Sequence, residues 1–142
     1  IKTVMDLGCG NGYLLEKLRE TMDLQEAAGV DIDPDAIRFG REKFPFLKLY
    51  QNDLFDFCLE KSDTRYDLVI LMPGRLEEQE SFERREALLK WLQGTATYIL
   101  LYGYDDWSWL IPRLSQRFFN YRWDKLSGIE SRRATTVLLR AR

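Results

Sequence analysis

Apolar residues recur along the chain in two alternating patterns, as short continuous runs and as stretches in which they stand three or four positions apart. The first pattern predicts strands, and the second predicts helices with one buried face. Leu14, Leu15 and Leu18 recur in this second way within residues 11–22. We expect strands at residues 3–7, 27–32, 46–50, 66–72, 95–102, 121–126 and 135–140. We expect helices at residues 11–22, from 34 to a point before 45, at 54–60, at 81–93, and from about 108.

Proline, glycine and acidic residues mark several ends of these elements. Asp33 is a good N-cap, and Pro34 suits the first position of a helix because its missing N–H has no helical partner there. Pro73 and Gly74 are expected to end the fourth strand and to open a polar loop. Gly94 is the expected C-terminal stop of the helix at residues 81–93.

The regular alternation of strands and helices indicates the fold class. At 142 residues the chain is predicted to form one domain, residues 1–142. Short connections between alternating strands and helices favour an α/β fold with a doubly wound, mostly parallel sheet and helices on both faces. In such sheets ligands bind beyond the carboxyl ends of the strands, where the strand order reverses.

Three glycines at alternate positions, Gly8, Gly10 and Gly12, follow the first predicted strand. Glycine is favoured where the backbone takes a positive φ or approaches a ligand closely, so this stretch predicts a strand, a tight turn and a helix start. Asp6 lies just before the turn.

Acidic residues also follow the second and third predicted strands. Asp31 can accept two hydrogen bonds from a ribose diol, and Asp53 can accept one from an adenine amino group. Ile32 and Leu54 would supply flat apolar contacts. Either acid alone could be a simple helix cap, but acids after consecutive strands together favour an adenosine-containing ligand.

Composition excludes several classes of protein. The 45% hydrophobic and 31% charged residues are ordinary globular values. The longest apolar runs are too short to span a bilayer, and no signal segment opens the sequence, so we expect a soluble, cytoplasmic protein without membrane contact. Cys9 and Cys58 are expected to be reduced and buried. The absence of histidine argues against a zinc site or a Ser-His triad, and we predict no metal site.

Charge is uneven along the chain, although the net charge is only −2. From Arg113 onward there are eight Lys or Arg residues against Asp124 and Glu130. A solvated basic edge is the ordinary explanation, and a surface for nucleic acid or another anion is the alternative.

Four segments together resemble successive motifs of the Rossmann-like S-adenosylmethionine-dependent methyltransferases. They are Met5-Asp6-Leu7-Gly8-Cys9-Gly10-Asn11-Gly12, Gly29-Val30-Asp31-Ile32-Asp33-Pro34, Asn52-Asp53-Leu54 and Tyr66-Asp67-Leu68-Val69-Ile70. The resemblance covers nearly the whole chain and implies a final antiparallel strand. It also implies S-adenosylmethionine as cofactor, whose methyl group passes to an N or O nucleophile.

The same resemblance implies the cofactor-binding residues. The methionine part is expected on Asp6 and the backbone of the glycine turn, the ribose on Asp31, and the adenine on Asp53 and Leu54. The full candidate set is Asp6, Gly8, Gly10, Asn11, Gly12, Asp31, Ile32, Asp53, Leu54 and Met72. The rival is a nicotinamide dinucleotide enzyme, but after Gly8 and Gly10 its third glycine would stand where this chain has Tyr13, and a pyrophosphate would sit poorly beside Asp6.

Candidate catalytic residues follow the fifth predicted strand. Without histidine, a general base must be a carboxylate, tyrosine, lysine or water, and Tyr104 and Asp105 lie at the correct sheet edge, with Asp106 beside them. The alternative is that the acids cap the next helix. Arg75 could bind an acidic substrate group, although pairing with Glu77 or Glu78 is the more ordinary outcome.

The methyl acceptor is not fixed by these motifs. The sequence Met72-Pro73-Gly74-Arg75 departs from the pattern of enzymes that methylate exocyclic amino groups of bases. We expect a small-molecule substrate, with a nucleic-acid or protein substrate, or a non-catalytic scaffold, as alternatives. The first strand begins almost at residue 1, so a covering lid is expected from an additional domain or subunit, unless the site is open to a large substrate.

Overall fold

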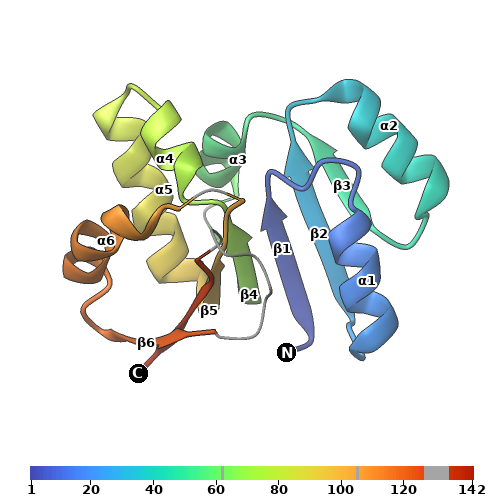
Figure 1. The fold of residues 1–142 in the computed structure, drawn as a ribbon. Coiled ribbons are helices and arrows are strands. Elements are labelled where there is room, and N and C mark those ends of the chain that lie inside the picture. Colours follow the sequence, from blue (N-terminus) through green and yellow to red (C-terminus); the bar gives the residue numbers. More distant parts are fainter. Residues whose placement is uncertain (62, 105, 127–134) are drawn as a thin grey trace.

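The computed structural model describes residues 1–61, 63–104, 106–126 and 135–142, and strands and helices alternate along most of it (Figure 1). The strands are β1 (Thr3–Leu7), β2 (Glu26–Asp31), β3 (Lys48–Gln51), β4 (Tyr66–Leu71), β5 (Ala96–Leu101), β6 (Tyr121–Lys125) and β7 (Val137–Ala141). The helices are α1 (Tyr13–Thr21), α2 (Pro34–Lys43), α3 (Leu54–Glu60), α4 (Gly74–Glu78), α5 (Phe82–Thr95), the 3-10 turn η1 (Ser108–Leu110) and α6 (Ile111–Arg117).

All seven strands form one sheet in the order β3-β2-β1-β4-β5-β7-β6. Strands β1 to β5 pair in parallel, whereas β7 is antiparallel to both of its neighbours, β5 and β6. This arrangement confirms the predicted α/β class and the antiparallel final strand. The chain order reverses between β1 and β4, which is where such a sheet opens for a ligand.

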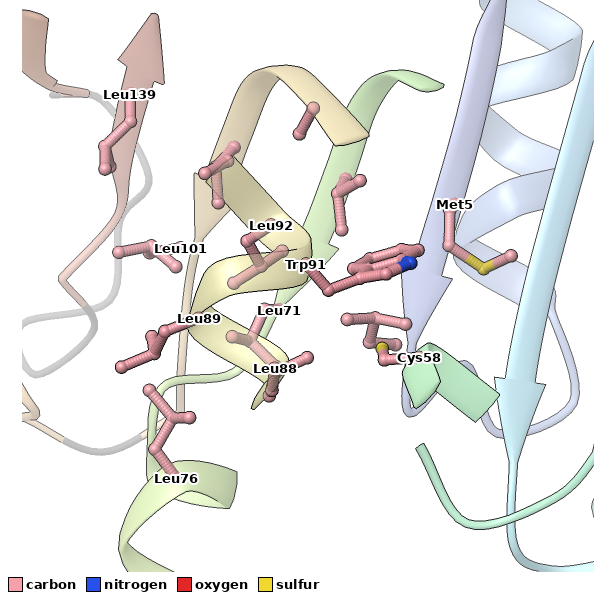
Figure 2. Packing of buried hydrophobic residues seen from close by; sticks show 14 of the residues in the cluster. Met5, Cys58, Leu71, Leu76, Leu88, Leu89, Trp91, Leu92, Leu101 and Leu139 are labelled. Carbon is pink, nitrogen blue, oxygen red and sulfur yellow. The ribbon is translucent and has the colours of Figure 1, made fainter. Parts of the chain in front are cut away.

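Helices cover both faces of the sheet with separate apolar cores. On one face, Leu15 of α1 and Ile37 of α2 pack over Val4 and Ile70 of the sheet. On the other face, α3, α5 and α6 contribute to a larger cluster. Figure 2 shows part of this cluster, in which Leu88, Trp91 and Leu92 of α5 gather with Leu71 of β4. Among the described residues, no helix is both long and apolar enough to cross a membrane.

The starts of two helices agree with the sequence prediction, because an aspartate side chain caps each of them. The Asp33 side chain accepts hydrogen bonds from the N–H groups of Asp35 and Ala36, as expected of the N-cap of α2. Helix α3 occupies the predicted residues 54–60, with Asp53 as its N-cap. Both cysteines are free and buried, as predicted.

Two local predictions were wrong. The segment after Pro73, expected to be a polar loop, begins a short helix, α4, whose Leu76 is buried. Gly94 does not stop α5, since the helix continues to Thr95 and the N–H of Ala96 donates to the carbonyl of Leu92. Gly94 has an ordinary helical φ here, so the left-handed conformation that makes glycine a helix stop is absent.

Candidate functional site

The glycine turn after β1 adopts the backbone conformation that its sequence requires. Gly8, Gly10 and Gly12 have φ values of 89°, 55° and 82°, in the left-handed region that other residues avoid. The N–H groups of Gly8 and Cys9 both donate to the carbonyl of Val30, at 2.8 and 3.0 Å. The turn is therefore fastened to the end of β2.

The side chain of Asp31 also holds this turn in place by hydrogen bonds. Its Oδ2 accepts from the N–H of Gly10 at 2.8 Å, and its Oδ1 accepts from the N–H of Asp33 at 2.9 Å. Each carboxylate oxygen has a second lone-pair direction, so both can still accept from a ribose hydroxyl. Asp31 thus shapes the turn and offers a diol acceptor beside it.

A cavity of about 270 Å³ opens at this edge of the sheet. It is lined by Gly8, Asp31, Ile32, Asp53, Leu54, Phe55, Arg75, Glu78 and Gln79. Five of the ten residues predicted to bind cofactor are therefore brought together around one space. Ile32, Leu54 and Phe55 provide apolar surfaces for a base, and Asp31 and Asp53 provide acceptors.

The other five predicted residues do not line this cavity. Asp6 is buried in β1, and Gly10, Asn11 and Gly12 complete the turn. Asn11 accepts at Oδ1 from the N–H of Tyr13, which helps to start α1.

Asp6 has an unusual protonation equilibrium. Burial, and secondarily the charge of Asp31, raises the pKa of the Asp6 carboxyl to about 7. No ion pair forms with Asp6 within residues 1–61 or the other described segments. A cationic ligand group close to Asp6 would favour the ionised carboxylate.

These residues fit S-adenosylmethionine. Its ammonium and sulfonium charges match a region that holds Asp6, Asp31 and Asp53, and the glycine turn leaves space for close approach. The guanidinium of Arg75, which lines the same cavity, can face the methionine carboxylate.

A second cavity, of about 330 Å³, adjoins the first. It is lined by Met72, Gly74, Arg75, Glu78, Gly103, Tyr104 and Trp107. Met72, predicted to bind cofactor, therefore lines this second space. Arg75 and Glu78 line both cavities, and they pair with each other at 2.9 Å, the outcome that the sequence favoured for Arg75.

The candidate catalytic residues lie at this second cavity or outside the described part of the chain. Tyr104 is 80% exposed, and its ring meets that of Tyr102 edge-on. Asp105 lies outside the described residues. Asp106 accepts from the N–H of Ser108, the first residue of η1, at 2.9 Å, although Trp107 holds the N-cap position.

Sequence reasoning missed several residues of the site. Phe55 and Gln79 line the first cavity, and Arg84 of α5 contacts Asp53 at 2.8 Å. Phe55 could have been found because it follows the predicted adenine-binding pair. Arg84 stands 31 residues from its partner and carries no local signal.

Comparison with known proteins identifies the family. The family model described as a methyltransferase domain matches residues 4–95, which hold the glycine turn, Asp31 and Asp53. The chain belongs to this methyltransferase domain family. Membership confirms the resemblance inferred from the motifs and places the chain in an enzyme family that uses S-adenosylmethionine.

Individual relatives agree with this assignment. The chain is 29% identical over 102 residues to the protein named putative methyltransferase 235L of Invertebrate iridescent virus 6, covering 70% of this chain and 37% of that protein. It is 32% identical over 84 residues to a Mycoplasma genitalium protein named uncharacterized protein MG259, covering 56% of this chain and 18% of that protein. The chain thus spans well under half the length of either relative.

Solved structures show the same fold. The N-methyltransferase NodS from Bradyrhizobium japonicum WM9, in complex with S-adenosyl-L-homocysteine, superposes with a TM-score of 0.71 at 14% identity. The alignment covers 99% of this chain and 78% of NodS. At this level of identity the likeness supports the fold alone.

Proposed function

We propose that this domain transfers a methyl group from S-adenosylmethionine to an N or O nucleophile of a small molecule. One observation supports this most strongly: the glycine turn, Asp31 and Asp53 surround a single cavity at the strand-order reversal. When bound, S-adenosylmethionine supplies an electrophilic methyl group on sulfur, so the chain has mainly to hold and orient its two ligands.

The second cavity supports a small acceptor. Its volume of about 330 Å³ lies within the range of small-molecule sites, and it shares Arg75 and Glu78 with the first cavity. An acceptor held between Tyr104 and Trp107 would lie beside the cofactor. We assign the Tyr104 hydroxyl the role of orienting the attacking atom, and Asp105 remains a predicted general base.

Asp31 provides the direct test of cofactor binding. We expect Asp31→Asn to weaken the binding of S-adenosylmethionine about 10- to 100-fold, because one charge-assisted acceptor for the ribose diol is lost. Isothermal titration calorimetry measures the change. Asp33→Asn is the matched control, since asparagine caps a helix as well as aspartate and Asp33 does not line the cavity. Equal affinities of the Asp31→Asn variant and the wild type would contradict the proposal.

The acceptor is sought by incubating the protein with radiolabelled S-adenosylmethionine and a fractionated cell extract. We expect label in small metabolites. Label in RNA or protein would instead support a macromolecular acceptor, for which the exposed Arg113 and Arg122 offer cationic contacts. Tight binding without transfer to any fraction would support a non-catalytic scaffold.

Tyr104 is tested once an acceptor is known. Tyr104→Phe is expected to lower kcat about tenfold or more while leaving the cofactor dissociation constant unchanged, because Tyr104 lines the second cavity and does not line the first. Steady-state kinetics measures both. Tyr13→Phe, an exposed tyrosine on α1, is the control. An unchanged kcat would remove Tyr104 from the mechanism.

We also propose that another domain or subunit packs on the open face of the sheet and extends from there over the site. Helices α1 and α2 pack on one face of the sheet. On the same face, Tyr98 and Leu100 of β5 and Leu138 of β7 are only partly buried. An apolar segment packed there would complete this side of the core.

We also propose that the protein is cytoplasmic, and this proposal rests on its amino-acid composition.

A further inference from the structure

We propose that Arg84 is a positioning residue that sets the cofactor's base specificity, because it holds the Asp53 carboxylate with one oxygen free for the adenine amino group. This inference rests on the proposed cofactor site. It assigns a role to a residue of α5 that does not itself line the cofactor cavity.

Arg84 joins two helices through its two terminal nitrogens. Its Nη2 donates to Asp53 Oδ1 at 2.8 Å, and its Nη1 lies 2.8 Å from Asp56 Oδ1. The guanidinium also lies over the ring of Phe55, 5.8 Å from its centre. Asp53 is the N-cap of α3 and Asp56 lies in its first turn, so one side chain fixes the start of α3 against α5.

The hydrogen bonds of Asp53 are concentrated on one oxygen. Oδ1 accepts from the N–H of Phe55 at 2.8 Å, the N–H of Asp56 at 3.2 Å and Arg84 Nη2 at 2.8 Å. Three donors on a single oxygen hold the plane of the carboxylate. Asp53 lines the cofactor cavity, and within the described segments its Oδ2 accepts no hydrogen bond, so Oδ2 is the oxygen left for a ligand.

The position of Arg84 leaves one donor unused. Its Nε is buried without a hydrogen-bond partner among the described residues. A buried donor without a partner is unfavourable, so other contacts have to hold the guanidinium in place. The two short contacts to Asp53 and Asp56 account for the orientation of the guanidinium.

A fixed acceptor discriminates between bases. Adenine presents an amino donor at its 6 position, whereas hypoxanthine presents a carbonyl oxygen there. A carboxylate oxygen that cannot turn away accepts from the first and repels the second, and sites built around one hydrogen bond reject the wrong group strongly. A carboxylate that is free to rotate loses part of this discrimination.

The test compares two ligands, S-adenosyl-L-homocysteine and S-inosyl-L-homocysteine, by calorimetry. We expect the wild type to prefer the adenosyl compound about 30-fold or more. Arg84→Gln is expected to reduce that preference at least fivefold, and Arg84→Lys to reduce it similarly because an ammonium cannot span both acids.

Arg117→Gln is the matched control. Arg117 also pairs across helices, at 3.0 Å to Glu86, and its Nε is likewise buried without a partner in the described part of the chain. It does not line the cofactor cavity, so the preference should stay at the wild-type value. Asp56→Asn is the second probe if Arg84→Gln folds poorly: it loosens the guanidinium, keeps the Asp53 charge and should reduce the preference in the same direction.

The outcomes separate this inference from the proposed function. Equal weakening of both ligands by Arg84→Gln, or no change in either, would overturn the positioning role. Equal affinities of the wild type for the two ligands would overturn it as well, while leaving cofactor binding intact. A wild type that binds neither ligand would refute the cofactor site itself.

Discussion

At the scale of single residues, the carboxyl of Asp6 lies where burial and the nearby charge of Asp31 make its ionised form unfavourable. It is 2% exposed, and burial raises its pKa to about 7 from an ordinary value of 3.8. Between those two pH values the folded state keeps a proton that the unfolded chain releases. The free energy of unfolding therefore falls as the pH rises through this range and stays low above about pH 7.

Replacement of Asp6 tests this residue. We expect Asp6→Asn to abolish the fall in stability, which in the wild type amounts to at most about 4 kcal/mol between pH 4 and pH 8. Urea unfolding of both proteins, without cofactor, at several pH values measures it. The variant should also bind S-adenosylmethionine more weakly at pH 8, because it lacks the charge that we propose attracts the cationic groups of the cofactor. A wild-type-like fall in the variant would contradict this assignment.

At the scale of elements, helix α2 packs against the glycine turn through a residue without a side chain. A Cβ at Gly40 would clash with the backbone carbonyl oxygen of Asn11 and would lie 2.6 Å from Leu49 Cδ1. The carbonyl belongs to the turn and cannot rotate away as a side chain can. Gly40 is therefore coupled to the shape of the cofactor site from 29 residues along the chain.

A pair of glycine substitutions tests this packing. Gly40→Ala is expected to lower the free energy of unfolding by about 1–3 kcal/mol and to weaken cofactor binding, because the turn or α2 must shift. Gly94→Ala, in α5 with no atom within 4 Å of the added Cβ, should be neutral or raise stability by up to about 1 kcal/mol. Chemical denaturation and calorimetry measure both. Equal effects of the two substitutions would show that the contact with Asn11 is unimportant.

Sequence analysis succeeded where the cause of an element is local. The bounds of α3 were predicted because Asp53 caps the helix from the adjacent position, and the glycine turn because its three positive φ values need glycine. Helix α4 was missed because Pro73-Gly74 resembles a loop, whereas burial of Leu76 against residues distant in sequence stabilises a helix there.

Only the part of the site that follows from the sheet topology could be predicted from the sequence. The parallel order placed Asp31 and Asp53 at one edge, as the structure shows. The contact of Arg84 with Asp53, and the second cavity between α4 and the segment after β5, depend on packing between distant segments. Neither leaves a periodic or motif-like signal in the sequence.

At the scale of the whole molecule, the cofactor site and much of the core depend on different parts of the chain. The residues that line the first cavity lie between Gly8 and Gln79, whereas β6 and β7 complete the far side of the sheet. Val137 and Leu139 of β7 are buried against the α5 side. Stability and cofactor affinity should therefore respond separately to changes in β7.

Leu139 tests that separation. Leu139→Ala is expected to lower the free energy of unfolding by about 2–5 kcal/mol, because a fully buried side chain leaves a cavity, without changing cofactor affinity below the unfolding temperature. Leu138→Ala, whose side chain is only partly buried on the opposite face, should cost less. Thermal unfolding and calorimetry measure the two quantities. A parallel loss of affinity in Leu139→Ala would show that β7 shapes the cofactor site.

The Arg75–Glu78 pair has a consequence for catalysis, because it forms part of the wall of both cavities. A rotation of either side chain to admit one ligand changes the space and the charge offered to the other. With methyl donor and acceptor in these two cavities, as we propose, the two ligands are thermodynamically linked, and the affinity for each depends on whether the other is present.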